Sequence, residues 1–151
     1  MSIFSSFNAS ASGLTAQRLR MDIVSGNLAN SHTTRATMNE NGEFEPYRRK
    51  MVTLAPTKNS FKTYLDKATN HSKNHAQGVR VKEITDDGQP FKLAYNPSHP
   101  DANADGYVQM PNVDPLKEMV DLMSATRSYE ANITALNASK SMLMKTLEIG
   151  K

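Results

Sequence analysis

The sequence predicts a mainly α protein with a small β insert, in which long N- and C-terminal helices pair as a coiled-coil-like helical domain. Large apolar residues recur every seven positions near both ends of the 151-residue chain, where Pro and Gly are rare. Alternating and turn-forming residues are confined to the middle. We expect residues 1–32 and 113–151 to form one helical core domain. Residues 33–112 should form a middle β-rich region with a flexible, basic loop at 56–78.

The first long helix is expected over residues 3–30. Four large apolar residues are spaced seven apart along it: Phe7, Leu14, Met21 and Leu28. This spacing keeps one face of a helix toward a partner helix. Gly13 and Gly26 each lower helix stability by about 1 kcal/mol relative to Ala, so the helix needs neighbours. It should end in the Asn- and Thr-rich run that begins at Asn27, because such side chains compete for backbone groups.

The middle region contains several candidate strands. Residues 47–54 read as one strand. Residues 79–84 and 91–95 read as two more, joined by a turn at Asp87-Gly88, which predicts a hairpin. Residues 107–110 are expected to form a last short strand. The insert has too few apolar residues for a large core, so we expect the terminal helices to pair and the middle to project.

The second long helix is expected over residues 115–149. Asp114 is a good helix cap and Pro115 suits the first helical position, while Gly150 is a typical stop. One heptad position holds Leu122, Tyr129, Leu136 and Leu143, and the interleaved position holds Met119, Thr126, Ile133, Lys140 and Leu147. Such a seam fits a partner helix in the same chain or on another subunit.

Contacts between subunits are predicted along both helices. Polar residues near the apolar faces, among them Arg18, Arg127 and Glu130, either fix the register between subunits or are exposed to solvent. The residues expected to form the interface are Phe7, Leu14, Met21, Asn27, Leu28, Asn30, Met119, Leu122, Tyr129, Glu130, Ile133, Leu136, Leu143 and Leu147.

Composition excludes several classes of function. The chain has no Cys, which excludes disulfides, thiol catalysis and Cys-bound zinc. No apolar run approaches the ~18 residues of a membrane span, and we expect no cleavable secretory signal at the N-terminus. The net charge is +3, and most of the excess lies in residues 48–82. This basic segment is either a solvated loop or a surface for nucleic acid or anionic lipid, which is the alternative function.

Candidate chemical sites are weak. Asp101, Asn103 and Asp105, followed by a glycine, match the first half of a calcium loop, but Asn112 stands where the bidentate Glu is required. An Asx-rich turn, whose carboxylates bond their own backbone, explains these residues better and leaves only a weak calcium site as the alternative. His71 and His75 lack a third ligand. There is no nucleophile motif and no phosphate loop, so we expect no enzyme activity, no small-molecule substrate, no cofactor and no bound metal.

Motifs at both ends resemble a known family. Residues 11–35 contain Asn-Leu-Ala-Asn, and residues 113–151 contain Ser-Tyr-Glu-Ala-Asn; both resemble the terminal helices of bacterial flagellar axial proteins. Four further segments are more selective: Thr33-Thr34-Arg35, Pro46-Tyr47-Arg48-Arg49-Lys50, and the stretches at 78–84 and 96–114. Together they are similar to the proximal-rod members of the family. The resemblance covers nearly the whole chain, with 56–78 as its least similar part.

The resemblance implies a structural protein of the flagellar basal body. Copies of the chain and other rod proteins would stack helically, with the terminal helices forming the inner layer of a hollow rod and the β portions facing outward. Other implied partners are the export gate and the membrane-ring base, so contact with the membrane would be peripheral only. Family members are exported without a cleaved signal into the periplasmic or cell-wall space. Nucleic acid is not an implied partner.

Overall fold

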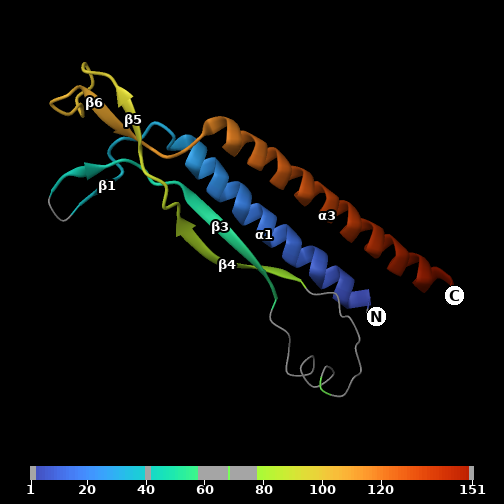
Figure 1. Ribbon diagram of the computed structural model, residues 1–151. Coiled ribbons are helices and arrows are strands. Elements are labelled where there is room, and N and C mark those ends of the chain that lie inside the picture. The colour runs from blue at the N-terminus through green and yellow to red at the C-terminus, as the bar shows by residue number, and fades with distance from the viewer. Residues whose placement is uncertain (1–2, 40–41, 58–67, 69–77, 150–151) are drawn as a thin grey trace. The chain divides into compact units, whose positions relative to one another are not determined.

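The computed structural model describes residues 3–39, 42–57, 68 and 78–149 (Figure 1). Long helices stand at both ends, α1 (Ile3–Ala29) and α3 (Pro115–Ile149). Between them the described residues form six strands: β1 (Thr37–Met38), β2 (Phe44–Glu45), β3 (Lys50–Pro56), β4 (Val79–Asp86), β5 (Lys92–Tyr95) and β6 (Tyr107–Met110). The predicted combination of two terminal helices with small sheets in the middle is confirmed.

The strands form three two-stranded ribbons, β1–β2, β3–β4 and β5–β6. In the antiparallel β5–β6 ribbon Lys92 is opposite Met110 and Tyr95 is opposite Tyr107. The predicted hairpin between 79–84 and 91–95 is therefore wrong. The Asp87 N–H donates to the Arg49 carbonyl at 2.8 Å, which holds the chain against β3 instead of turning it back. Gly88 has no positive φ, so the tight Asp-Gly hairpin turn does not form.

The chain divides into two compact units, each containing part of both helices. The first unit is Met1–Leu19, Thr53–Glu83 and Ala125–Lys151, and the second is Arg20–Val52 and Ile84–Ser124. The expected division into a helical core domain and a middle region stays a prediction. Neither helix of the described residues has a stretch long and apolar enough to cross a membrane.

Small residues bring the elements of the first unit together. Ala16 and Ala125 are buried. The Ser12 hydroxyl donates to the Ala9 carbonyl at 2.7 Å and accepts from the Val79 N–H at 3.0 Å, which ties α1 to the start of β4. A Cβ on Gly13 would lie 3.1 Å from Oδ1 of Asn132 on α3, so the glycine allows a close approach of the two helices.

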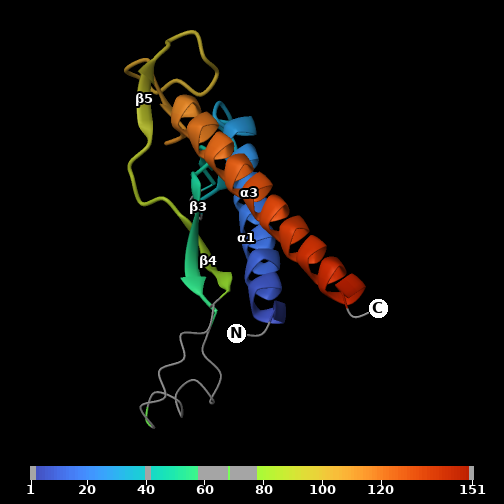
Figure 2. The ribbon, with the colours of Figure 1, turned by 90° about the vertical axis from the view of Figure 1, so that its right-hand side faces the viewer.

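The second unit has a small core that mixes apolar and polar side chains. Its buried apolar residues include Val24, Val108 and Val113, and its buried polar residues include Asn27 and Glu118. The first turns of α3 lie beside the last turns of α1 in both views (Figures 1 and 2). A core with so few apolar side chains depends on its polar contacts.

Gly106→Ala is expected to destabilise the protein by about 2–3 kcal/mol in urea unfolding, and Gly42→Ala by about 1 kcal/mol. Both glycines have positive φ, 80° and 82° respectively, which a side chain disfavours. A Cβ on Gly106 would also lie 3.0 Å from the Tyr95 ring and 3.2 Å from Pro97, whereas nothing lies within 4 Å at Gly42. Equal losses at the two sites would show that packing around Tyr95 adds nothing.

Candidate assembly surface

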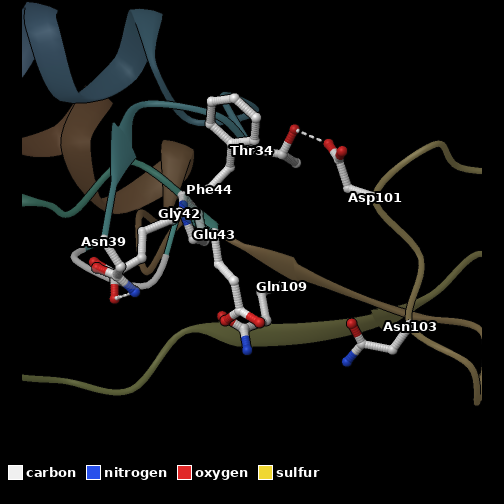
Figure 3. A pocket seen from close by; sticks show the side chains of 10 residues that line it. Thr34, Asn39, Gly42, Glu43, Phe44, Asp101, Asn103 and Gln109 are labelled. Atoms are coloured by element: carbon white, nitrogen blue, oxygen red, sulfur yellow. Dashed lines mark hydrogen bonds between the residues drawn. The ribbon is translucent and has the colours of Figure 1, made fainter.

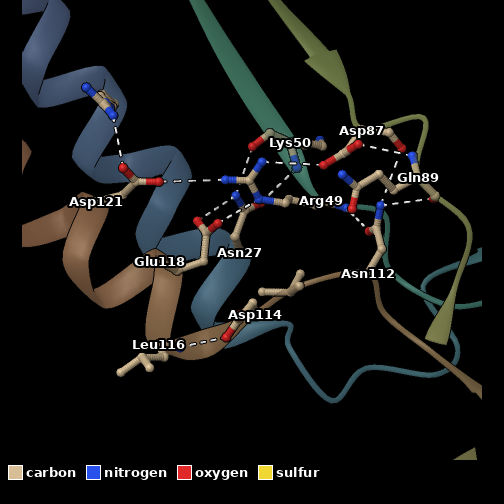
Figure 4. Close-up of polar contacts among 12 residues, drawn as sticks. Asn27, Arg49, Lys50, Asp87, Gln89, Asn112, Asp114, Leu116, Glu118 and Asp121 are labelled. Carbon is tan, nitrogen blue, oxygen red and sulfur yellow. Dashed lines mark hydrogen bonds and ion pairs between the residues drawn. The ribbon is translucent and has the colours of Figure 1, made fainter.

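A buried ionic network joins the two helices to strand β3 (Figure 4). The Glu118 carboxylate, on the first turns of α3, is 0% exposed. Arg49, directly before β3, donates from Nε to Glu118 Oε1 at 2.6 Å. Asn27, near the end of α1, donates from Nδ2 to Glu118 Oε2 at 3.0 Å. A negative charge so close to the start of a helix is also favoured by the helix dipole.

Asn27 is fully satisfied within the chain. Its amide nitrogen also donates to the Lys50 carbonyl at 2.8 Å, and its amide oxygen accepts from the Lys50 N–H at 2.9 Å and from the Tyr47 hydroxyl at 3.0 Å. Burial, together with the charges of Asp86 and Glu118, raises the pKa of Tyr47. The hydroxyl therefore stays protonated and keeps donating. Asn27 thus positions strand β3 against the end of α1.

The Arg49 guanidinium is enclosed by carboxylates. Besides Glu118 it meets Asp87 Oδ2 at 3.4 Å and Asp121 Oδ2 at 3.8 Å, and Asp121 also accepts from Arg20 at 3.1 Å. Burial alone would lower the pKa of Arg49, but hydrogen bonds to Glu118 and Asp87 and their charges raise it. Arg49 therefore carries its charge among three carboxylates of its own chain, with 13% of its side chain exposed.

Sequence reasoning missed this network. The sequence placed Arg49 in the basic segment 48–82 and Asp87 in a turn, where a carboxylate is usually exposed. In the structure the relative exposure of Asp87 is 7%. Asp87 is enclosed because its carboxylate accepts from Arg49 and from the Gln89 N–H at 3.0 Å. Asn112 adds a further link, since its Oδ1 accepts from the Arg49 N–H at 2.8 Å. The signal available in the sequence was the position of polar residues at the helix ends, with Asn27 at the end of the first helix and Asn112 and Glu118 at the start of the second.

The predicted interface residues differ in exposure. Asn27 is buried inside the chain. Half-buried positions are Phe7, Leu14, Met21, Leu28, Asn30, Leu122, Tyr129, Leu136 and Leu143. Exposed positions are Met119, Glu130, Ile133 and Leu147. One heptad position of α3 is thus half-covered within the chain, while the interleaved position is exposed at Met119, Ile133, Lys140 and Leu147 and half-buried at Thr126. Among the polar candidates, Arg18 is exposed, and Arg127 pairs with Glu130 on the surface at 3.1 Å.

An exposed apolar stripe runs along the first turns of α3. Its members are Leu116, Met119, Val120 and Met123, which are 73%, 48%, 54% and 61% exposed. The spacing i, i+3, i+4, i+7 places all four on one helix face, and Glu118 and Ala125 point away from it into the chain. We call this face the α3 stripe. Of its members, the predicted interface includes Met119, and the sequence also marks Met123 as one of four methionines of α3 that suit an interface. Leu116 and Val120 lie outside the heptad positions and were not predicted.

The weak calcium candidate is engaged in other contacts. Asp101 accepts from Arg35 Nε at 2.7 Å and from Thr34 Oγ1 at 2.9 Å, and these hydrogen bonds lower the pKa of its carboxyl. The backbone carbonyl of Asn103 accepts from the Gly106 N–H at 2.8 Å in a turn, and the side chains of Asn103 and Asp105 are exposed. Within the described part of the chain, no cluster of three His, Cys, Asp or Glu residues is placed to hold a metal ion. His71 and His75 lie outside it.

Family comparisons match both helical ends. The family described as "Flagella basal body rod protein" matches residues 7–37, and the family described as "Flagellar basal body rod FlgEFG protein C-terminal" matches residues 104–149. These matches include most of α1 and α3, the α3 stripe and both helical partners of the ionic network. They define the class as a structural protein of the flagellar rod.

Full-length relatives give the particular family. The chain is 62% identical to "Flagellar basal-body rod protein FlgC" of Bacillus subtilis, with 100% of both chains covered. It is 44% identical to the same-named protein of Borreliella burgdorferi, covering 99% of this chain and 98% of the relative. For the Salmonella typhimurium protein the identity is 38%, with 100% of both chains covered. The chain therefore belongs to the FlgC family of flagellar basal-body rod proteins.

Family membership gives this protein a structural role. It is a rod subunit located in the flagellar basal body, and it is not an enzyme. The alternative, a helical scaffold that binds nucleic acid or an anionic surface through residues 48–82, is not supported. Arg49, one of the basic residues on which that alternative depended, is enclosed by carboxylates of its own chain.

Proposed function

We propose that the chain forms part of the proximal rod and polymerises with copies of itself and with other rod proteins through its terminal helices. The α3 stripe carries this proposal. A soluble protein rarely leaves a contiguous row of large apolar side chains exposed unless another molecule covers it. Family membership supports the rod as the place where the covering occurs, and other rod proteins as the neighbours that provide it.

The size of the stripe indicates how assembly is stabilised. Fully burying a Leu, Val or Met side chain contributes about 1.5–3 kcal/mol, so four such residues contribute several kcal/mol. Association costs roughly 4–15 kcal/mol in lost motional freedom and ordering. One stripe is therefore insufficient for a tight dimer. The exposed residues near the end of α3, Met142, Met144, Leu147 and Ile149, supply further contact area in a polymer where each subunit meets several neighbours.

Coiled-coil-like pairing of α1 and α3 supplies the stiffness that a drive shaft needs. In the first unit Gly13 approaches Asn132, and in the second Arg20 pairs with Asp121 and Asn27 with Glu118. On α1 these contact residues are seven apart, the repeat of a helix-packing seam. In the rod we place this helical layer inside and the β ribbons outside. We also propose that the chain is exported through the flagellar apparatus and that it contacts the export gate and the membrane-ring base.

Methionine oxidation tests the proposal without altering the chain. Met119, Met123, Met142 and Met144 are exposed on α3, and Met38 is exposed on β1. Dilute peroxide should oxidise all five in the purified protein, because thioether oxidation follows exposure. In isolated basal bodies we expect the α3 methionines to react at least about tenfold more slowly while Met38 keeps its rate. Mass spectrometry of tryptic peptides measures each rate, and unchanged oxidation of Met119 and Met123 would contradict the proposal.

A further inference from the structure

A second exposed apolar surface lies in the second unit, on the β5–β6 ribbon. One face of the ribbon packs inward, with Val108 buried and Ala94 half-buried. The opposite face is formed by Leu93, Tyr95, Tyr107 and Gln109, all exposed, with Leu93 opposite Gln109 and Tyr95 opposite Tyr107. We call it the tyrosine face. Aromatic side chains are enriched at protein–protein interfaces, where they supply large contact areas at low entropic cost.

The tyrosine face is held in a fixed arrangement before any partner arrives. The rings of Tyr95 and Tyr107 meet edge to face with their centroids 5.3 Å apart. Gly106 lies beneath the Tyr95 ring at a distance that leaves no room for a side chain. Exposed aromatic rings that are already ordered lose little freedom on binding, which favours recognition.

Gln109 connects the tyrosine face to an acidic hollow of about 420 Å³ (Figure 3). Glu43, Glu45 and Asp101 contribute carboxylates to its lining, and Phe44 contributes an aromatic ring. Asp101 is neutralised by Arg35, whereas Glu43 and Glu45 form no ion pair with any residue that the structure describes, so they leave the hollow negatively charged. An apolar aromatic face that continues into an acidic hollow suits an occupant that combines lysines with aromatic and aliphatic side chains.

We propose that residues 58–73 of a second copy of the chain dock on the tyrosine face and the acidic hollow. This lysine segment carries Lys58, Lys62, Lys67 and Lys73 against a single acidic residue, Asp66. Its apolar side chains are Phe61, Tyr64 and Leu65. The charge of the segment complements that of the hollow, and complementary potentials decide which partner binds. Because copies must be neighbours for this contact, the docking rests on the self-assembly proposed above.

Cysteine cross-linking between two full-length copies tests the docking, since the native chain contains no Cys. One copy carries Ser60→Cys and a differently tagged copy carries Gln109→Cys. After mixing and mild oxidation, we expect a mixed disulfide dimer in at least tenfold greater yield than with the matched control Gln89→Cys. Gln89 is an exposed glutamine of the same unit that lies outside the tyrosine face.

Charge and apolar variants in the Gln109→Cys copy sharpen the test. Glu43→Lys should lower the yield about tenfold, and Lys62→Glu in the other copy should restore it. Leu93→Ser should lower the yield several-fold, whereas Ile84→Ser, at an exposed apolar residue away from the face, should leave it unchanged. Comparable loss with Ile84→Ser would overturn the assignment of the tyrosine face.

Three results would overturn the docking. The first is an equal yield of mixed disulfide with Gln109→Cys and with Gln89→Cys. The second is a yield that Glu43→Lys does not change. The third is an intrachain disulfide in a monomer that carries both Ser60→Cys and Gln109→Cys. The last result would assign the segment to its own chain. Failure of the docking is distinguishable from failure of rod assembly, because protection of Met119 and Met123 in basal bodies reports on the α3 stripe independently.

Discussion

Val120→Asp is expected to abolish swimming in a strain that relies on this chain for its rod. Val120 is one of the two central residues of the α3 stripe and is 54% exposed. Replacing it should therefore leave the stability of the folded chain almost unchanged. Val and Asp have similar helix propensities. In the assembled rod, however, the carboxylate would be enclosed by apolar side chains without a partner. Burying this unpaired carboxylate costs about 3 kcal/mol. Because 1.4 kcal/mol corresponds to a factor of ten in a binding constant, each contact is weakened on the order of 100-fold.

Three measurements separate assembly from folding and export for this variant. Swimming in soft agar and electron microscopy of basal bodies report on the rod, the urea midpoint reports on folding, and immunoblots of the exported fraction report on export. The matched control is Thr134→Asp, which adds the same charge to the same helix face fourteen residues further on, beyond the apolar stripe. Normal rods with Val120→Asp, or equal damage from both changes, would contradict a specific role for the α3 stripe.

Glu118→Ala is expected to lower the free energy of unfolding by about 3 kcal/mol, because removing one member of a buried ion pair leaves the other charge uncompensated. Arg49 would lose its 2.6 Å contact and keep Asp87 at 3.4 Å, which moderates the loss. Asn27 would lose one acceptor but keep the Lys50 carbonyl at 2.8 Å. Urea unfolding followed by circular dichroism measures the change.

Glu130→Ala is the matched control for this prediction. Glu130 stands on the same helix and is also paired with an arginine, but its side chain is 56% exposed. Exposed pairs contribute about 0–1 kcal/mol, so its loss should be close to the error of measurement. The loss of unfolding free energy for Glu118→Gln should lie between the losses for Glu118→Ala and Glu130→Ala. The amide oxygen of Gln still accepts a hydrogen bond, but the negative charge is gone. Equal midpoints for Glu118→Ala and Glu130→Ala would show that burial does not strengthen the network.

Elements governed by neighbouring residues were predictable from the sequence. The start of α3 follows from Asp114 and Pro115, and in the structure Asp114 Oδ1 accepts from the Leu116 N–H at 3.1 Å. The last strand, Tyr107–Met110, was predicted within its observed bounds because turn residues delimit it. Capping and turn chemistry act within a few residues, so they can be read along the chain.

Strand pairing and burial were decided by the tertiary structure. Asp87-Gly88 is a good local turn signal, yet β4 pairs with β3, and the Asp87 N–H continues this association by donating to the Arg49 carbonyl. Such pairing depends on segments far apart in sequence.

The sequence by itself determined the two long helices, their heptad residues and the membership of a rod family. Only the tertiary structure decided that Arg49, within a run of three basic residues, is an internal ion-pair partner and that the α3 stripe remains open. The physical reason is that a side chain's solvent exposure depends on what packs against it, and these packing partners are distant along the chain.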